Sequence, residues 1–214
     1  MEGQADDYAF MAWGLLELHQ ATLDPRWLEA CEALLRAARP RFFDEADGLI
    51  FAGGVEGDRH LPARIKDAHD NVEPAPASVF ADVQLRLWGL GLGEGWRADA
   101  ERALKGHLRD LARAPRSLPF MAAALARALD PPRRLVVAGS LEDEGTQALL
   151  AVGRARWLPD LDRIQVDPSR PLPGWAAGFT LVDQRPAAYL CRDFACDRPV
   201  TEVDRLKDAL GIAK

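Results

Sequence analysis

The densest cluster of ionisable side chains lies in residues 66–74, whose sequence is KDAHDNVEP. Asp70 and Glu73 are three residues apart and come just before a helix expected to begin near Pro76. Two carboxylates beside a cleft can serve as general acid and general base when their surroundings give them different pKa values. His69 could act as a proton shuttle beside them. The alternative is a solvated loop whose acids cap the following helix, and the residue types alone favour that alternative.

A second polar cluster, Asp6-Asp7-Tyr8, opens the first expected helix of the chain. Acidic side chains in the first turn of a helix stabilise it through the helix dipole. Asp7 and Tyr8 are therefore open to two interpretations. They either bind a ligand at a cleft or only stabilise the start of the helix.

Cys191 and Cys196 enclose four residues in the sequence CRDFAC. That spacing differs from the two-residue spacing of redox-active pairs and zinc knuckles. A zinc site would need two more ligands, and all four histidines lie before residue 108. We interpret the pair as structural thiols, with a redox-sensitive pair or a metal site as weaker alternatives, and predict no metal site. The odd total of three cysteines argues against a disulfide framework and favours a reducing cytoplasm.

The turn at residues 137–140 follows an expected strand and precedes an expected helix, which is the position of a phosphate-binding turn. It contains a single glycine, Gly139, and the acids Glu142, Asp143 and Glu144 follow it. Those acids would repel an anion and instead stabilise the start of the helix. The sequence therefore predicts no nucleotide or other cofactor.

The elements that must position these residues are helices in the first part of the chain, residues 1–132. Asp24-Pro25 combines a favourable N-cap with proline at the first helical position. The apolar residues after it keep one helical stripe, and a helix over residues 7–22 precedes it. Because only Leu23-Asp24 separates the two helices, we expect an antiparallel hairpin.

Two further helices are expected over residues 79–90 and 96–111, followed by a third over 117–129 that ends at Pro131-Pro132. His107 lies on an apolar helix stripe, where a hydrogen-bonded core histidine is expected.

Two stretches between the helices are not helical in pattern. Asp47-Gly48 between apolar runs predicts a short β-hairpin or tight loop over residues 42–51. Residues 53–77 form a long polar loop, and loops of that length are usually functional or disordered.

The second part of the chain, residues 133–214, reads as a small α/β segment. Short strands are expected at residues 135–138, 164–166 and 187–190, with a helix over 142–157. Thr201, with Asp204 three residues later, resembles a capping box for a last helix that ends at Gly211.

Composition excludes several classes of protein. The net charge is −6 and charges of both signs are interspersed, which argues against nucleic acid or an anionic membrane as the main partner. The N-terminus is acidic where a secretory signal is basic. No apolar run approaches the ~20 residues of a membrane helix. We therefore expect a globular cytoplasmic protein.

A series of short motifs extends over nearly the whole chain. They are Asp7-Tyr8-Ala9-Phe10, Phe42-Phe43-Asp44-Glu45, Asp47-Gly48, Asp70-Asn71-Val72-Glu73-Pro74, Ser78-Val79, Pro132-Arg133, Arg185-Pro186-Ala187-Ala188-Tyr189-Leu190-Cys191, Phe194-Ala195-Cys196 and Pro199-Val200-Thr201. In this order they resemble the spermatogenesis-associated, thioredoxin-domain-containing proteins and their bacterial relatives. Members of that family look like an N-terminal thioredoxin-like domain followed by an (α/α)6 toroid, similar to those of N-acylglucosamine 2-epimerases and six-hairpin glycosidases.

The resemblance implies a mainly α fold, with residues 1–132 as part of such a toroid and residues 133–214 as an α/β appendage. The chain would then be a C-terminal fragment that closes the ring. An incomplete ring would expose apolar helix faces, which the missing N-terminal half or a second copy must cover.

The resemblance also implies a cleft for a carbohydrate or related polyol. Acid/base chemistry would fall to Asp70 and Glu73, and substrate binding to Asp7, Tyr8, Lys66 and Ser78. The family usually has Ser-x-Asn-Ser after the Glu-Pro pair, and this chain keeps only Ser78, which removes polar groups at the cleft mouth. The alternative function is a non-catalytic scaffold that binds another polypeptide.

Overall fold

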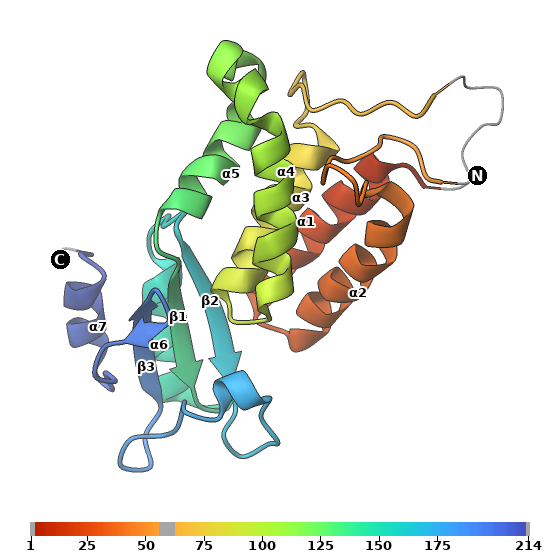
Figure 1. Cartoon of the computed structure of the whole chain (residues 1–214). Helices are drawn as coiled ribbons and strands as arrows, with labels where there is room; N and C mark the ends of the chain where they lie inside the picture. Colours follow the sequence, from red (N-terminus) through yellow and green to blue (C-terminus); the bar gives the residue numbers. More distant parts are fainter. Residues whose placement is uncertain (1–2, 56–62, 213–214) are drawn as a thin grey trace. The chain divides into compact units, whose positions relative to one another are not determined.

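The computed structural model describes residues 3–55 and 63–212, so residues 56–62 of the expected long loop lie outside the described residues. Within those ranges the chain forms seven α-helices and one four-stranded sheet (Figure 1). It divides into two compact units. The helical unit contains Met1–Trp88 and Gly93–Asp130, and the sheet unit contains Gly89–Leu92 and Pro131–Lys214. No helix in the described ranges is long and apolar enough to cross a membrane.

The first two helices of the helical unit form the predicted hairpin. α1 (Ala5–Thr22) and α2 (Pro25–Phe42) lie side by side (Figure 1). Leu23 ends α1 in the left-handed conformation, with φ of 59°. The Asp24 carboxylate accepts a hydrogen bond from the Arg26 N–H at 3.0 Å. This cap confirms the helix start that the residue types predict.

The third helix, α3 (Pro76–Gly89), forms the centre of the helical unit. Every residue from Ala77 to Gly89 is buried, so its polar side chains need partners. Asp82 accepts a hydrogen bond from Arg127 at 2.7 Å, and this pair joins α3 to α5 (Pro119–Leu129). A helix buried on all sides is expected to be held by such pairs as well as by apolar packing.

The fourth helix, α4 (Glu94–Arg113), is tied to α2 by charge. Arg39 donates a hydrogen bond to Asp99 at 2.7 Å. His107 of α4 is buried as predicted, but within the described residues neither ring nitrogen makes a hydrogen bond. Its Nδ1 lies 3.6 Å from the carboxylate of Asp110. The predicted hydrogen bond is therefore wrong, because the Asp110 carboxylate lies too far away to accept one.

A tight turn follows α2, as the Asp47-Gly48 pair predicts. Phe43 and Ile50 form an isolated antiparallel bridge, and the Asp44 side chain accepts a hydrogen bond from the Ala46 N–H at 2.8 Å. Gly48 has φ of 76°, and a Cβ at this position would lie 2.7 Å from Cβ of Arg102. Only glycine combines that backbone conformation with so close an approach.

The sheet unit has the strand order β2-β1-β3-β4. β1 (Arg133–Ala138) pairs in parallel with β2 (Leu161–Val166) and antiparallel with β3 (Ala187–Arg192), and β4 (Ala195–Cys196) pairs antiparallel with β3. The three predicted strands are confirmed and are longer than predicted.

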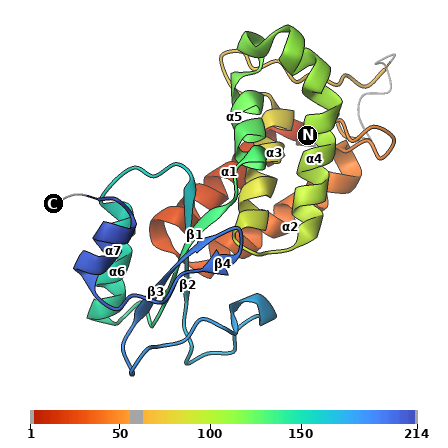
Figure 2. The same cartoon turned by 60° about the vertical axis from the view of Figure 1, so that its left-hand side comes forward.

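Two helices pack together in the sheet unit (Figure 2). α6 (Glu144–Arg154) connects the parallel strands, and the Asp143 side chain caps it. α7 (Val203–Ala209) begins after Glu202, which provides no side-chain cap bond. The capping box predicted from Thr201 and Asp204 is therefore wrong. The helix starts later than predicted, so Asp204 lies within its first turn and pairs with Lys207 at 3.0 Å.

Candidate functional site

A groove runs along α1 in the helical unit. Its volume is about 730 Å³. It has an apolar part and an acidic part, and its lining consists of Asp6, Asp7, Phe10, Met11, Gly14, Leu15, Leu18 and Glu73. The acids come from the first turn of α1 and from the loop that precedes α3, and the apolar residues follow α1 toward its C-terminal end.

The acidic part of the groove brings three carboxyl groups together. Asp7 accepts a hydrogen bond from the Gln4 N–H at 2.8 Å and belongs to the capping box of α1. Partial burial, followed by the nearby carboxylates of Glu73 and Asp7, raises the pKa of Asp6 above its ordinary value of 3.8. Because like charges disfavour ionisation of a neighbour, Asp6 holds its proton more tightly than an isolated aspartate.

Asp70, a predicted acid/base residue, is a structural cap. One carboxylate oxygen accepts the Ala75 N–H at 2.8 Å, and the other accepts the N–H groups of Phe120 and Met121 at 2.8 and 3.3 Å. The side chain thus satisfies backbone donors at the start of α5, which would otherwise be unpaired. The Asp70 N–H also donates to the Ser117 carbonyl at 2.9 Å.

Lys66, a predicted binding residue, forms ion pairs with Asp44 and Asp47 at 2.6 and 2.7 Å. Burial alone would lower the pKa of Lys66, but the hydrogen bonds to the two carboxylates outweigh it and raise that pKa. The ammonium also lies 4.6 Å from the centre of the Phe51 ring. Lys66 therefore fixes the loop to the turn after α2.

Tyr8 and Ser78 also lie outside the groove lining. The Tyr8 ring packs edge-on against Phe42 at 5.1 Å, with the guanidinium of Arg41 5.8 Å from its centre. Ser78 is fully buried in α3, and within the described residues its hydroxyl has no hydrogen-bond partner.

The structure thus brings together Asp7 and Glu73 from the predicted set, and adds Asp6. Sequence reasoning did not select Asp6 as a site residue, although its position beside Asp7 in the first turn was the signal that could have done so. In the described part of the chain, no three His, Cys, Asp or Glu side chains gather in a way that could hold a metal ion.

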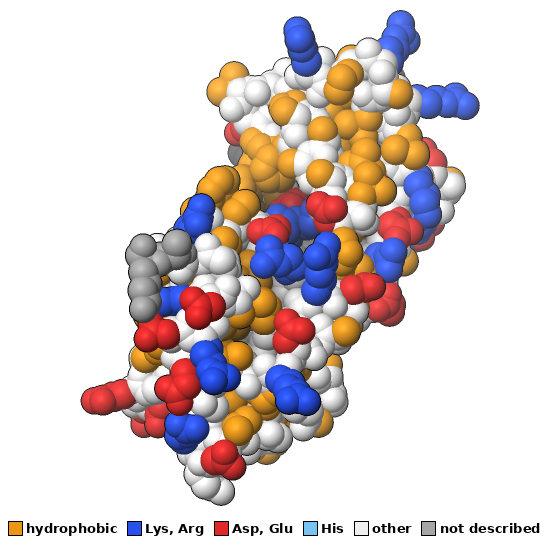
Figure 3. All heavy atoms as spheres, turned by 90° about the vertical axis from the view of Figure 1, so that its left-hand side faces the viewer, with side chains coloured by type: hydrophobic (Ala, Val, Ile, Leu, Met, Phe, Trp, Pro, Cys, Tyr) orange, Lys and Arg blue, Asp and Glu red, His pale blue; other side chains and the backbone are white. Residues whose placement is uncertain are grey.

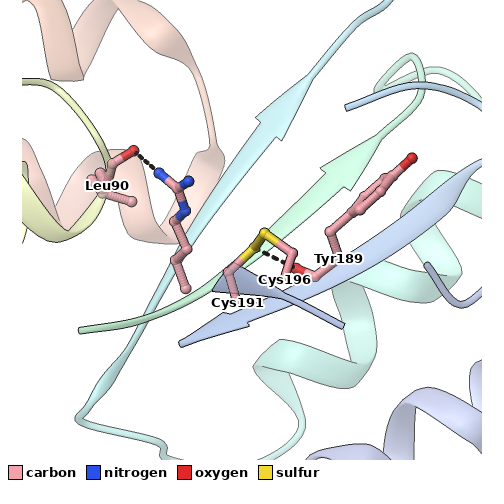
Figure 4. Close-up of a disulfide and its surroundings, with 5 residues drawn as sticks. Leu90, Tyr189, Cys191 and Cys196 are labelled. Carbon is pink, nitrogen blue, oxygen red and sulfur yellow. Dashed lines mark hydrogen bonds between the residues drawn. A yellow bond between two sulfur atoms is a disulfide. The ribbon is translucent and has the colours of Figure 1, made fainter. Parts of the chain in front are cut away.

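A second chemical feature lies in the sheet unit. Cys191 and Cys196 form a disulfide between β3 and β4 (Figure 4). The expectation that the odd cysteine count argues against a disulfide is therefore wrong at these two positions. The odd cysteine count requires only that one thiol stay unpaired. That thiol is Cys31, which is buried and lies 3.3 Å from the Ala12 carbonyl.

Charged side chains of both signs are interspersed on the face shown in Figure 3, with no single basic patch on that face. This distribution agrees with the mixed charge of the sequence.

No family model matches this chain. It is 31% identical over 214 residues to spermatogenesis-associated protein 20 of Homo sapiens and, at the same identity, to that of Rattus norvegicus, and each match covers 97% of this chain and 27% of the relative. It is 26% identical over 210 residues to an uncharacterised protein of Caenorhabditis elegans, covering 95% of this chain and 28% of that protein.

The chain therefore spans little more than a quarter of the length of these relatives. Their similarity extends over almost the whole of this chain, as the series of motifs does. The comparison supports the resemblance to the spermatogenesis-associated protein 20 family.

Proposed function

We propose that this chain is a helical segment that helps to complete a longer protein, an (α/α)6 toroid, and that the groove along α1 is where neighbouring polypeptide packs. The observation that carries this proposal is the apolar outer face of α1. Met11 is 59% exposed and Leu18 is 45% exposed. Residues seven apart lie on the same side of a helix. Exposed apolar faces of this kind usually bind another protein surface.

The shape of this face suits a helix. Leu15 lies between Met11 and Leu18, so apolar anchors occur at the spacing with which one helix contacts another. Gly14 leaves open space, since a Cβ there would meet no atom within 4 Å. A small residue beside exposed apolar ones lets a second helix approach closely. The relatives are long enough to supply such a helix, because about three quarters of their length lies outside the matched region.

The experiment compares the chain with a Met11→Lys, Leu18→Lys double variant. The probe is the part of the human relative that this chain does not cover, and complex formation is measured by sedimentation velocity. We expect the wild-type chain to bind the probe and the double variant to lose binding at least tenfold, since two charges would be buried. Leu129→Lys is the matched control, because Leu129 is 76% exposed and lies outside the groove.

Two outcomes would count against the proposal. One is a chain that stays monomeric, binds no hydrophobic dye and forms no complex with the probe. The other is a double variant that binds as well as the Leu129→Lys control. Self-association that the double variant abolishes would instead identify a second copy of the chain as the occupant of the groove.

A second candidate function is carbohydrate binding or processing at the same groove. It is favoured by the carboxyl groups of Asp6 and Glu73, which both line the groove, and by the raised pKa of Asp6. The Phe10 ring beside them could face a sugar ring. Of the two acids that the sequence predicts, Glu73 is the better candidate, because the Asp70 carboxylate is occupied by backbone donors.

Saturation-transfer NMR with glucose, N-acetylglucosamine and a linear polyol tests this second function. We expect transfer to at least one of the three ligands and its loss in Glu73→Gln. Asp67→Asn serves as the control, because Asp67 is acidic and exposed but does not line the groove. Absence of transfer from the wild-type chain to all three would remove the carbohydrate hypothesis and leave the polypeptide proposal standing.

A further inference from the structure

The disulfide of the sheet unit closes an unusually tight turn. Between Cys191 and Cys196, the central residues Asp193 and Phe194 have φ of 50° and 61°. Non-glycine residues rarely adopt this left-handed conformation, and a bulky residue such as Phe does so only when its surroundings enforce it. The strand pairing beyond the turn consists of two residue pairs, Cys191 with Cys196 and Arg192 with Ala195. The disulfide adds a covalent link to this short pairing, and the Asp193 N–H donates a hydrogen bond to the Pro132 carbonyl at 2.9 Å.

The two sulfurs differ in their accessibility. Cys191 is 1% exposed, whereas Cys196 is exposed to solvent at the edge of the sheet. A thiolate approaching from solvent must reach the sulfur that it attacks. Cys196 is the exposed residue of the pair, so attack is expected at its sulfur, and Cys191 would be the leaving group.

The strand position paired with Cys191 carries a buried cation. Arg134 of β1 is the register partner of Cys191 across the β1–β3 pair, and side chains of paired residues lie on the same face of a sheet. Arg134 is only 7% exposed, and its Nη1 donates a hydrogen bond to the Leu90 carbonyl at 2.8 Å. Figure 4 shows Leu90 and the disulfide in the same region of the sheet unit.

The charge of Arg134 has no carboxylate partner among the described residues. Its guanidinium lies 5.4–5.9 Å from the centres of three aromatic rings, those of Trp175, Phe179 and Phe194. Its Nε is buried and makes no hydrogen bond in the described part of the chain. Burial lowers the pKa of Arg134. A buried guanidinium without a carboxylate partner can stabilise a negative charge that forms beside it.

We propose that Cys191 and Cys196 form a thiol–disulfide exchange site for an external dithiol, in which Cys196 is attacked, Cys191 leaves as a thiolate and Arg134 stabilises that thiolate. Arg134 acts through Cys191 and is a positioning residue. This site lies in the sheet unit and does not depend on the function proposed for the groove in the helical unit.

The exchange balances as a two-electron transfer. A thiolate of the dithiol attacks Sγ of Cys196, a new S–S bond forms, and the bond to Cys191 breaks. Sγ of Cys191 leaves with the electron pair and takes up a proton from solvent. The second thiol of the dithiol then attacks the mixed disulfide and releases the Cys196 thiol. The dithiol is oxidised to a disulfide, and this chain is reduced by two electrons and two protons.

Reduction has a structural consequence. With the disulfide open, the turn keeps the short β3–β4 pairing and the hydrogen bond that the Asp193 N–H donates to the Pro132 carbonyl at 2.9 Å, but it loses the covalent link between the two strands. The turn is then expected to loosen.

The test uses the whole chain with two probes, reduced glutathione and dithiothreitol. Glutathione is added, the reaction is quenched with acid, and peptide mass spectrometry locates the mixed disulfide, which we expect on Cys196. The rate of reduction by dithiothreitol is followed by maleimide labelling of the released thiols. We expect Arg134→Met to slow reduction by roughly tenfold, because a less stabilised thiolate is a poorer leaving group.

Three controls keep the result interpretable. Arg133→Met removes a neighbouring arginine of β1 that is paired with Asp160, and it should leave the rate unchanged. Arg134→Lys restores a positive charge and should recover part of the rate, which a purely structural role of Arg134 would not explain. The buried thiol of Cys31, whose pKa burial raises to about 12, should stay unlabelled while the protein is folded.

The proposal is overturned if glutathione is found on Cys191, or if Arg134→Met and Arg133→Met are reduced at equal rates. Labelling of Cys31 in step with reduction would also overturn it, since exchange would then require global unfolding. The proposal is also overturned if the reduced thiols of Cys191 and Cys196 do not form a disulfide again in oxidised glutathione. If Arg134→Met does not fold, two measurements decide whether the proposal holds. They are the location of the glutathione mixed disulfide by mass spectrometry and the reduction rate of Arg134→Lys.

Discussion

At the scale of single residues, the hydrogen-bond partners of a carboxylate decide whether it stabilises the fold or is available to bind a ligand. The Asp70 carboxylate accepts three backbone N–H groups, from Ala75, Phe120 and Met121. It therefore joins the loop before α3 to the start of α5. Glu73, three residues later, is exposed and lines the groove. The two acids look equivalent in the sequence, but they have different roles in the structure.

Asp70→Ala should destabilise the protein. Loss of the cap leaves helix donors unpaired, and we expect the free energy of unfolding to fall by about 2 kcal/mol. Glu73→Gln is the matched control and should change that free energy by less than about 0.5 kcal/mol. Urea unfolding followed by circular dichroism measures both. Equal stability of Asp70→Ala and the wild type would contradict the capping role.

Asp6→Asn should have an effect that depends on pH. The folded pKa of Asp6 is raised above its ordinary value of 3.8, so the unfolded chain releases this proton first as the pH rises. The contribution of Asp6 to stability is therefore complete below pH 3.8 and is lost as the pH rises through the folded pKa. Because solvent screens this partly exposed group, we expect Asp6→Asn to stabilise the protein by only ~0.3 kcal/mol at pH 7.

Thermal unfolding of Asp6→Asn and wild type across a pH series checks this expectation. The difference should shrink toward zero as the pH approaches 3.8. A difference that grows as the pH falls would have the wrong sign and would exclude the proposed cause.

At the scale of elements, the surroundings of helical glycines distinguish the packed faces of helices from the open ones. Gly14 of α1 faces open space, whereas a Cβ on Gly106 of α4 would collide with the Leu49 side chain in the turn after α2. The same residue type thus marks an open groove in one helix and a close contact in another.

Gly14→Ala and Gly106→Ala form a matched pair of variants. Alanine is favoured over glycine inside a helix by about 1 kcal/mol, so Gly14→Ala should raise the free energy of unfolding by up to that amount. Gly106→Ala should lower it by about 1 kcal/mol, because Leu49 must move. Chemical denaturation measures both values. Equal effects of the two substitutions would show that the turn does not pack on α4 as described.

At the scale of the whole molecule, the described residues form two compact units, and their one disulfide lies in the sheet unit. The free cysteine of the described chain, Cys31, lies in the helical unit. Redox conditions should therefore act on one unit and leave the other unchanged.

Reduction should selectively loosen the sheet unit. A disulfide that closes so short a loop stabilises by about 2 kcal/mol in the chain-entropy account. Hydrogen exchange followed by mass spectrometry, with and without dithiothreitol, should show faster exchange in residues 187–200 and unchanged exchange in α1 and α2. A Cys191→Ser, Cys196→Ser variant should reproduce the reduced pattern and lose its response to dithiothreitol. Equal acceleration in both units would contradict this division.

Features that depend on local spacing could be predicted from the sequence. The hairpin of α1 and α2 follows from the Asp24-Pro25 cap and apolar periodicity, and the strands of the sheet unit follow from short apolar runs. The capping box at Thr201 was wrong because the start of a short helix depends on neighbours that local pattern does not include. His107 shows the same limit of local pattern. Its burial could be predicted from the apolar stripe on which it lies, but the absence of a hydrogen-bond partner among the described residues could not be predicted.

The candidate site was only partly predictable. Asp7 and Glu73 were selected from the sequence and do line the groove, whereas Lys66, Tyr8, Ser78 and Asp70 lie outside its lining. Residue type shows that a side chain can ionise, but not which neighbours it meets.

The sequence by itself determined the helical first part, the α/β second part, the overall charge and the resemblance to a family. Only the tertiary structure decided that Asp70 caps α5, that Asp6 shares a groove with Glu73, and that Cys191 pairs with Cys196 beside Arg134. The physical reason is distance along the chain. Helix caps and apolar stripes act within a few residues, whereas shared grooves and strand register join residues that lie tens of positions apart and meet only after folding.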